Sequence, residues 1–257
     1  RQGDGRDVKF NQDGTKMFVL GKSNDSVCEY TLSTGFDVSS TVTFIDCFSV
    51  ADQEDEPDDL QFSPDGTKMF VIGCEAASDD ESYINEYTLS TAFDISTASF
   101  VHSFNFVATS SEEGGMDMTF NYDGTKMWMT GWIENSIFEY DLSTAWDVRT
   151  ATLFGEVAGA FVDWDDGPST FVFNPDASKI FVLGSTDDKV SEFKLYCTYG
   201  IVACKDPTSD KDDVAAVESQ TESAKQLIQH TTYPVLNRME WLRRNNNNSN
   251  SVSYTHL

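Results

Sequence analysis

Carboxylate side chains supply most of the chemistry that this sequence could perform. Asp7, Asp59 and Asp117 each stand just before a short segment in which apolar and polar residues alternate. If the fold brings these three together they could bind Ca²⁺, a hard cation that takes several oxygen ligands, and we predict them as its ligands. The wider set of predicted ligand- or cation-binding residues adds Asp58, Glu112, Glu113, Asp163, Asp165 and Asp166. The sequence has no Asp-x-Asp-x-Asp-Gly loop, so simple solvation of acidic loops is the alternative.

These acidic connections separate copies of a repeated unit. The four copies are Val8–Gly21, Leu60–Gly73, Met118–Gly131 and Phe171–Gly184. Each copy is followed by a second, shorter repeated segment, which begins at Glu29, Glu86, Glu139 and Glu192. The marker aspartates Asp13, Asp65, Asp123 and Asp176 lie 52, 58 and 53 residues apart by subtraction. A repeat of this length that is made of short strands predicts a propeller or a similar array.

One repeat contains four predicted strands. In the first copy Val8 and Phe10 alternate with polar residues, and an Asp-Gly turn leads to strands at 16–20, 27–32 and 42–48. Four antiparallel strands correspond to one propeller blade. We therefore predict an all-β fold, a β-propeller of four visible blades followed by an α-helical tail. The predicted blades span about 7–50, 59–107, 117–158 and 170–204. The aspartates before the inner strands would then ring the mouth of the central channel.

Aromatic residues recur at three places in the repeat. We expect two sets to fill the core between blades: Phe10, Phe62, Phe120 and Phe173, and Phe18, Phe70, Trp128 and Phe181. A third set, Phe36, Phe93 and Trp146, lies in the loop after the third strand and is predicted to anchor that loop, with Tyr199 in the same place in the last copy. These residues are predicted to build the fold rather than to bind a ligand.

The segment Phe62–Val71 reads Phe-Ser-Pro-Asp-Gly-Thr-Lys-Met-Phe-Val and resembles the repeats of Tol-type and WD-like bacterial β-propellers. The resemblance covers about Asp7 to Cys204. It implies the architecture and leaves the function open, because such repeats occur in periplasmic, secreted and phage proteins alike.

Three functions are consistent with a propeller that has an acidic face. Our leading hypothesis is an exported, non-enzymatic binding or adhesion module, with no catalytic residue assigned. The enzyme alternative is a calcium-dependent lactonase-like hydrolase, since that chemistry uses carboxylates around a metal. The sequence has three histidines, His102, His230 and His256, and no visible Ser/His/Asp motif. A phage structural propeller is a further alternative.

The sequence changes character after Cys204. We predict a linker over 205–213, helices over 214–244 and a disordered end over 245–257. The segment Val235–Arg244 resembles the region ahead of the outer-membrane barrel in marine alphaproteobacterial autotransporter-like proteins. That resemblance implies a propeller displayed at the cell surface, attached to a membrane only through a barrel that is missing from this sequence. A helix that packs on another subunit or domain is the alternative.

The charge of the chain disfavours one class of partner. The chain carries 17 basic and 43 acidic residues, a net charge of −26. Nucleic-acid binding needs clustered Lys and Arg and is therefore disfavoured. We expect a protein or glycan ligand, no cofactor other than calcium, and an extracellular or outer-membrane location with the periplasm as the alternative. The oligomeric state stays open.

Five cysteines are present. Cys28 and Cys47 lie on predicted neighbouring strands, and Cys197 and Cys204 are close enough in sequence to bridge a turn. Burial as small hydrophobic residues is as consistent with this pattern as disulfide formation. The sequence does not begin with Met, and its end, Ser251–Leu257, resembles translated sequencing adapter. We interpret the sequence as a fragment of a longer protein.

Overall fold

The computed structural model describes residues 4–73, 82–110, 112, 114–131, 136–157, 168–184, 189–195 and 198–201, together with the backbone of 219–223. These residues form four antiparallel sheets of four strands each, within the compact unit Arg1–Thr221 except for the last two residues of the final strand. The prediction of an all-β propeller with four visible blades is confirmed.

Each blade is a meander in which consecutive strands pair. Blade 1 holds β1 (Gly5–Phe10), β2 (Lys16–Gly21), β3 (Ser26–Leu32) and β4 (Val42–Ser49). Blade 2 holds β5 (Pro57–Phe62), β6 (Lys68–Gly73), β7 (Tyr83–Leu89) and β8 (Ala98–Asn105). Blade 3 holds β9 (Gly115–Phe120), β10 (Lys126–Gly131), β11 (Ile137–Leu142) and β12 (Ala151–Val157). Blade 4 holds β13 (Pro168–Phe173), β14 (Lys179–Gly184), β15 (Lys189–Lys194) and β16 (Ser219–Ser223).

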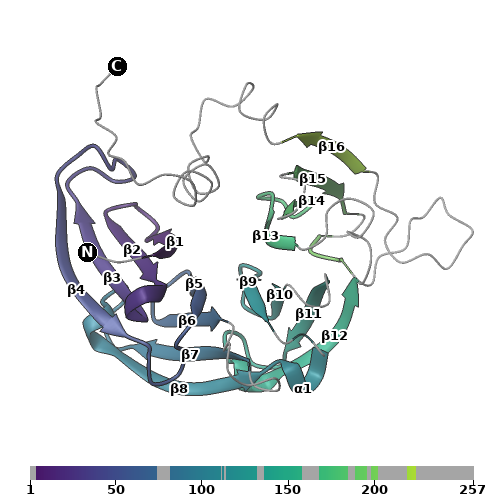
Figure 1. Cartoon of the computed structure of the whole chain (residues 1–257), viewed down its shortest axis with the longest axis horizontal. Helices are drawn as coiled ribbons and strands as arrows, with labels where there is room; N and C mark the ends of the chain where they lie inside the picture. The colour runs from purple at the N-terminus through teal and green to yellow at the C-terminus, as the bar shows by residue number, and fades with distance from the viewer. Residues whose placement is uncertain are drawn as a thin grey trace, which may run out of the picture. The chain divides into compact units, whose positions relative to one another are not determined.

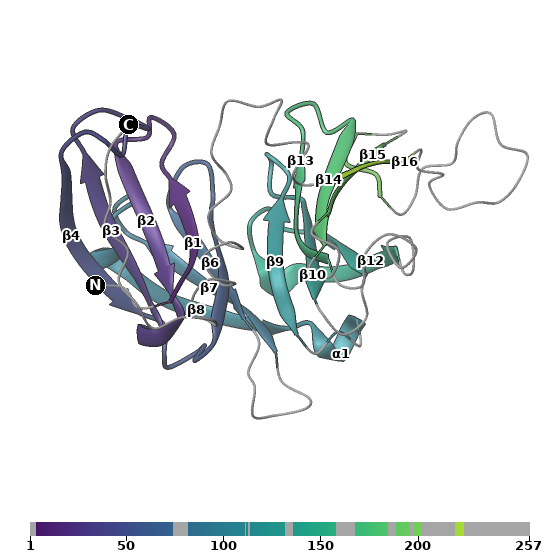
Figure 2. The same ribbon diagram turned by 45° about the horizontal axis from the view of Figure 1, so that its top comes forward.

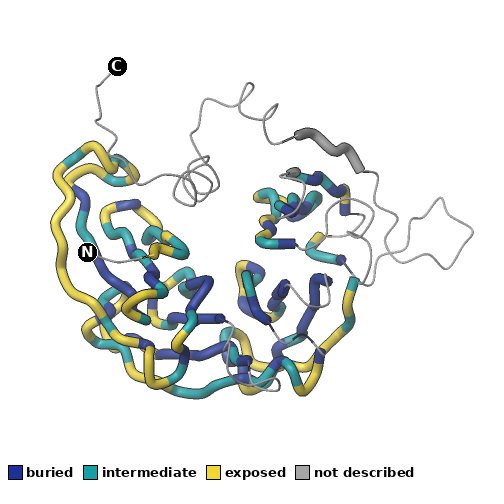
Figure 3. Tube along the Cα trace, viewed as in Figure 1, coloured by how far each residue is buried: buried dark blue, intermediate teal, exposed yellow. Residues whose placement is uncertain are grey.

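The first strand of each blade is the innermost one. β1 contacts β5, β5 contacts β9, and β9 contacts β13, so these inner strands lie next to one another in chain order (Figures 1 and 2). The second and third strands are largely buried between blades, whereas the fourth strand of blade 1 is almost wholly exposed (Figure 3). Short helical turns complete the described chain: η1 (Lys22–Asn24), η2 (Ile95–Thr97), η3 (Val148–Thr150) and α1 (Val107–Ser110).

A β-bulge recurs at the start of each inner strand. The pairing of β1 with β2 shifts between Gly5 and Asp7, and the pairing of β5 with β6 shifts between Pro57 and Asp59. The same shift occurs where β9 and β13 begin. A bulge re-aims the side chain that follows it. The residues placed directly after the bulges are Asp7, Asp59, Asp117 and Thr170.

Three aromatic side chains meet at each boundary between blades, and we call each group an interface trio. Phe18 and Phe62 lie 4.6 Å apart between ring centres, and Phe93 lies 5.7 Å from Phe62. The other two trios are Phe70, Phe120 and Trp146, and Trp128, Phe173 and Tyr199. Phe93, Trp146 and Tyr199 share a left-handed backbone (φ 54°, 60° and 59°). The predicted inter-blade aromatic core is thereby confirmed at these positions.

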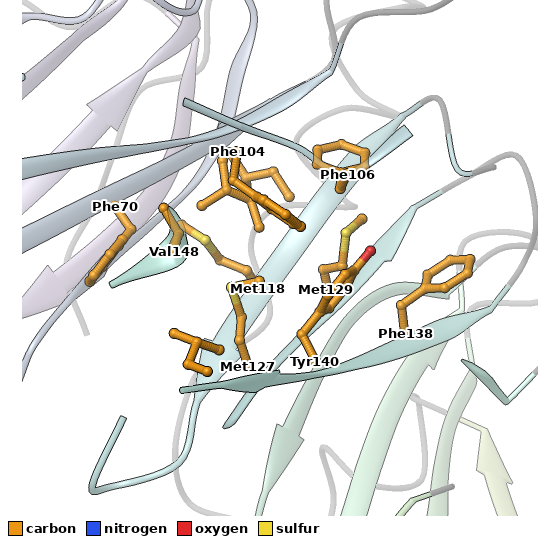
Figure 4. Close-up of a cluster of buried hydrophobic side chains, with 12 residues drawn as sticks. Phe70, Phe104, Phe106, Met118, Met127, Met129, Phe138, Tyr140 and Val148 are labelled. Carbon is orange, nitrogen blue, oxygen red and sulfur yellow. The ribbon is translucent and has the colours of Figure 1, made fainter. Parts of the chain in front are cut away.

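Apolar side chains fill the remaining space between blades. Figure 4 shows the cluster between blades 2 and 3, in which Phe70 of β6, Phe104 of β8, Met118 of β9 and Tyr140 of β11 pack together. Methionine is unbranched and adapts to irregular gaps, which suits a core that is built between curved sheets. Each blade therefore depends on its neighbour for burial of one face.

One disulfide and one unexpected strand complete the described fold. Cys28 and Cys47 face each other across β3 and β4 and form a disulfide. The helix prediction is wrong for Ser219–Ser223, which forms β16. Pairing with the free edge of β15 outweighs helical periodicity there, because strand formation depends on the available partner more than on intrinsic preference. Cys74, Cys197, Cys204 and the rest of 202–257 lie outside the described residues.

Candidate functional site

The three predicted aspartates link successive inner strands. The backbone N–H of Leu60 donates to Oδ2 of Asp7 at 3.2 Å, and the N–H of Met118 donates to Oδ2 of Asp59 at 3.2 Å. In the same way the N–H of Phe171 donates to Oδ2 of Asp117 at 2.8 Å. Each carboxylate therefore holds the next blade in register. The recurrent bulge explains these contacts, because it turns each aspartate side chain toward the inner strand of the next blade.

A lysine lies among these carboxylates. The ammonium of Lys9 is 3.0 Å from Oδ2 of Asp7 and 3.1 Å from Oδ1 of Asp59. The charge of Asp59 acts on Asp7, and the charge of Asp117 acts on Asp59. We call these four residues the inner-strand acid cluster. Sequence reasoning missed Lys9, although its spacing of two residues from Asp7 places both on the same face of β1.

Burial makes the carboxyl groups of the cluster unusually basic, and the charge of a neighbouring carboxylate adds to this effect for Asp7 and Asp59. Burial, followed by the charge of Asp59, raises the pKa of Asp7 from 3.8 to about 7. Burial likewise raises the pKa of Asp59 and of Asp117. Burial lowers the pKa of Lys9, but the negative charges of Asp59 and Asp7 have a larger effect, so the pKa of Lys9 lies above its ordinary value. Because 19% of the Asp7 side chain and 27% of the Lys9 side chain are exposed, against 6% for Asp59, a solute can reach Asp7 and Lys9.

The cluster as it stands does not fit a calcium ion. Each of the three carboxylates already accepts a backbone N–H, and the Lys9 ammonium lies between Asp7 and Asp59 where a cation would have to bind. In the part of the chain that the structure describes, no three His, Cys, Asp or Glu residues are grouped to hold a metal. The calcium site stays a prediction, and no chemical step below depends on it.

The other predicted site residues lie elsewhere. Asp58 is buried and its carboxylate is 3.3 Å from the Arg6 guanidinium. Glu112 is wholly buried and its carboxylate accepts the N–H of Gly114 at 3.0 Å, so it stabilises the turn before β9. The remaining predicted residues, Glu113, Asp163, Asp165 and Asp166, lie outside the described residues. Of the described predicted residues, only Asp7, Asp59 and Asp117 are brought together in the cluster.

A small cavity adjoins Lys9 between blades 1 and 2. Its volume is about 160 Å³. Its lining consists of Lys9, Phe10, Gln12, Gln61, Phe62, Ser63, Pro64 and Phe93. The cavity combines aromatic surface with amide and hydroxyl groups, which is the mixture that small polar ligands with an apolar face require.

Comparison with solved structures identifies the same fold in other proteins. The chain matches the periplasmic gluconolactonase of Pseudomonas aeruginosa with a TM-score of 0.51 and 14% identity, covering 86% of this chain and 55% of that one. A Bacteroides uniformis protein that is provisionally named a 6-phosphogluconolactonase matches with a TM-score of 0.52 and 13% identity, over 84% and 54% of the two chains. A Lactobacillus plantarum protein matches with a TM-score of 0.53 and 15% identity, over 74% and 50%.

These likenesses establish the propeller fold, and the chain spans about half the length of each matched protein. No family model and no curated protein matches the sequence. The Tol-type and autotransporter resemblances stay predictions. Within the described residues, no helix is long and apolar enough to cross a membrane.

The comparisons correct the leading functional hypothesis. We predicted a non-enzymatic binding or adhesion module, whereas two of the matched proteins are named as lactonases. These names favour the enzyme alternative over the adhesion module. The prediction was wrong because acidic loops and a repeat pattern define a scaffold, and the sequence has no motif that separates a binding face from a hydrolytic one.

Proposed function

We propose that this protein is a lactonase-like hydrolase that opens cyclic esters of sugar acids at the inner-strand acid cluster. The observation that carries the proposal is the carboxyl of Asp7, which has a pKa of about 7 and lies 3.0 Å from the Lys9 ammonium. General acid–base catalysis is most effective when the pKa of the catalytic group is close to the working pH. The lactonase names of two matched proteins support the substrate class.

The reaction needs one group that moves a proton and one that stabilises negative charge. In the ionised form, Asp7 accepts a proton from a water molecule while the water oxygen bonds to the lactone carbonyl carbon. The carbonyl oxygen becomes an oxyanion, which the Lys9 ammonium stabilises electrostatically. The ring C–O bond then breaks, Asp7 returns the proton to the departing ring oxygen, and the product is the open hydroxy acid.

Asp59 serves as a positioning residue in this scheme. It is buried, its Oδ1 is 3.1 Å from the Lys9 ammonium, and its Oδ2 accepts the N–H of Met118. Its carboxylate thus fixes Lys9 from the side away from the solvent. Its negative charge also contributes to the raised pKa of Asp7. The cavity of about 160 Å³ beside Lys9 offers space for part of a small polar substrate.

We further propose that the protein works outside the cytoplasm, in the periplasm. The Cys28–Cys47 disulfide supports this, since disulfides persist in oxidising compartments. The periplasmic location in the name of the Pseudomonas aeruginosa protein is consistent with it. Fractionation of cells that express the complete gene would test the location.

The rate of lactone opening can be measured from the acid that the reaction releases. Glucono-1,5-lactone and its 6-phosphate are suitable probes in a pH-stat, with the uncatalysed rate subtracted at each pH. We expect kcat/KM to rise with pH through an apparent pKa of about 7. Asp7→Asn is expected to lower kcat by about 10²- to 10⁴-fold, the usual contribution of a general base.

The matched control is Asp46→Asn, because Asp46 is an exposed aspartate on the outer strand β4. It should leave the rate unchanged. A wild-type rate no greater than the blank on both lactones would refute the proposed function. Full activity of folded Asp7→Asn would refute the role of Asp7.

A further inference from the structure

The cavity beside Lys9 lies against the inner strand of blade 2, which has a neighbouring blade on each side. β5 contacts both β1 and β9. Gln61 of β5 lines the cavity two residues after Asp59, and a spacing of two puts both side chains on the same face of the strand. The cavity and the inner-strand acid cluster are therefore adjacent along β5.

Two glutamine amides of the cavity have a fixed orientation. Nε2 of Gln61 donates to the backbone carbonyl of Met118 at 2.9 Å and to Oδ2 of Asp59 at 3.3 Å. Nε2 of Gln12 donates to the carbonyl of Pro64 at 2.6 Å. A carbonyl oxygen can only accept a hydrogen bond, so each amide has to turn its nitrogen toward that carbonyl and its oxygen away from it.

The amide oxygens of Gln12 and Gln61 are therefore unused acceptors. Among the residues that the structure describes, neither oxygen receives a hydrogen bond. The hydroxyl of Ser63, which also lines the cavity, is already engaged, since it donates to Asp65 at 2.6 Å and accepts the N–H of Lys68 at 3.0 Å. The free polar groups that the two glutamines present to a ligand are thus acceptors, and they require a ligand with hydrogen-bond donors.

Apolar surface completes the lining. Phe62, Phe93 and Pro64 are each partly exposed and line the same cavity. The space of about 160 Å³ is many times the roughly 10–15 Å³ that one water molecule needs, so the cavity admits a small solute. A sugar ring matches this lining, because its hydroxyl groups are donors and its C–H groups pack on apolar surface.

We propose, building on the function proposed above, that this cavity is the subsite that recognises the hydroxyl groups of the substrate. The amide oxygens of Gln12 and Gln61 accept hydrogen bonds from two ring hydroxyls, and both glutamines are specificity-determining residues. Lys9 lines the cavity and also belongs to the acid cluster, so a ring bound here lies next to the proposed catalytic groups. A lactone without hydroxyl groups leaves both oxygens unpaired and is disfavoured for that reason.

Binding of an unreactive ring tests the subsite separately from the chemistry. 1,5-Anhydroglucitol has the hydroxylated six-membered ring of a sugar but no carbonyl, and tetrahydropyran has the same ring without hydroxyl groups. Titration followed in ¹H–¹⁵N spectra should give a Kd for 1,5-anhydroglucitol about tenfold or more below that for tetrahydropyran, as two hydrogen bonds predict. The side-chain amide signals of Gln12 and Gln61, identified by their loss in the variants below, should shift on binding.

Gln12→Met and Gln61→Met should each weaken the binding of 1,5-anhydroglucitol about two- to tenfold, since each removes one acceptor. Gln12 is exposed in a turn, so its substitution keeps the test valid even if loss of the Gln61 bond to Met118 disturbs β9. Thr119→Val is the matched control, because Thr119 holds the place of Gln61 on β9 and does not line the cavity. Its Kd should equal that of the wild type. Equal Kd values for the two rings, or an unchanged Kd in both glutamine variants, would overturn the proposal.

The rates on two lactones separate this subsite from the proposed reaction. The ratio of kcat/KM for glucono-1,5-lactone to kcat/KM for δ-valerolactone, which lacks hydroxyl groups, should fall about two- to tenfold in Gln61→Met. Effects of the substitution on the acid cluster act on both lactones and cancel in this ratio. Glutamine-dependent binding of 1,5-anhydroglucitol without hydrolysis of either lactone would support the subsite and refute the proposed function. Hydrolysis with an unchanged ratio in both glutamine variants would refute the subsite alone.

Discussion

Replacing Asp7 by asparagine should remove a pH dependence from the stability of the protein. In the unfolded chain Asp7 ionises at its ordinary pKa of 3.8, whereas in the folded protein it keeps its proton up to about pH 7. Between these values the folded state binds more protons than the unfolded state, so the free energy of unfolding falls as the pH rises. The asparagine of the variant does not titrate, and its side-chain oxygen can still accept the N–H of Leu60.

The size of the effect follows from the pKa difference. One pKa unit corresponds to about 1.4 kcal/mol, so the full shift of Asp7 costs at most about 4 kcal/mol above pH 7. About 3 kcal/mol of this develops between pH 5 and pH 8. The raised pKa values of Asp59 and Asp117 act in the same direction but are present in both proteins. The difference between wild type and variant therefore measures Asp7 together with its coupling to Asp59.

Urea unfolding followed by tryptophan fluorescence at pH 5 and pH 8 would measure this difference. We expect Asp7→Asn to gain up to about 3 kcal/mol relative to the wild type on going from pH 5 to pH 8. Asp46→Asn, the exposed control, should show no such gain. Two stability profiles that run parallel within about 0.5 kcal/mol would show that Asp7 is ionised in the folded protein, and the general-base argument would then lose its basis.

Three further predictions concern the repeat itself. Gly66→Ala should destabilise the protein by about 1–3 kcal/mol, because its φ is +70° and a methyl group there would overlap an aromatic ring; conversely, Ala177→Gly, at φ 51° in the same turn of blade 4, should stabilise it by about 1 kcal/mol. Thermal unfolding measures both, and equal effects of the two changes would contradict the argument. Trp128→Ala should cost about 3–5 kcal/mol in urea unfolding, since the side chain is fully buried in an interface trio; a cost below about 1 kcal/mol would contradict that packing. Reduction of the Cys28–Cys47 disulfide, which closes a separation of 19 residues, should cost about 3 kcal/mol, and an unchanged melting temperature with dithiothreitol would contradict the pairing.

The fold could be predicted from the sequence because the pattern occurs four times. Aromatic residues such as Phe62 and Phe93 recur at fixed offsets, and only a repeated packing contact requires that. The contact of Asp7 with the next blade was harder to predict, since the bulge that aims Asp7 at Leu60 depends on pairing between strands and leaves no local signal. Without that geometry, an aspartate that holds the next blade cannot be distinguished from a metal ligand.

At the C-terminal strand β16, the local sequence pattern predicts the wrong secondary structure. The spacing of apolar residues around Ser219–Ser223 is helical, but an unpaired sheet edge on β15 offers hydrogen bonds that a local pattern cannot anticipate. For a related reason, the sequence pattern of Cys28 and Cys47 was equally consistent with a disulfide and with two buried thiols. The sequence indicates the strands on which the cysteines lie, whereas the register that places them opposite each other comes from the bulge at Glu29 and Tyr30.

The position of the disulfide has a consequence for how the array opens. The outermost strand of a blade packs on only one neighbouring strand of its sheet, so local opening begins there most readily. In blade 1 this strand is β4, which is almost wholly exposed, and Cys28–Cys47 ties it to the third strand. The covalent tie raises the free energy of local opening where neighbour contacts are fewest. Reduction of the disulfide should accordingly speed the exchange of amide hydrogens in β3 and β4, and leave the exchange in β7, the third strand of blade 2, unchanged.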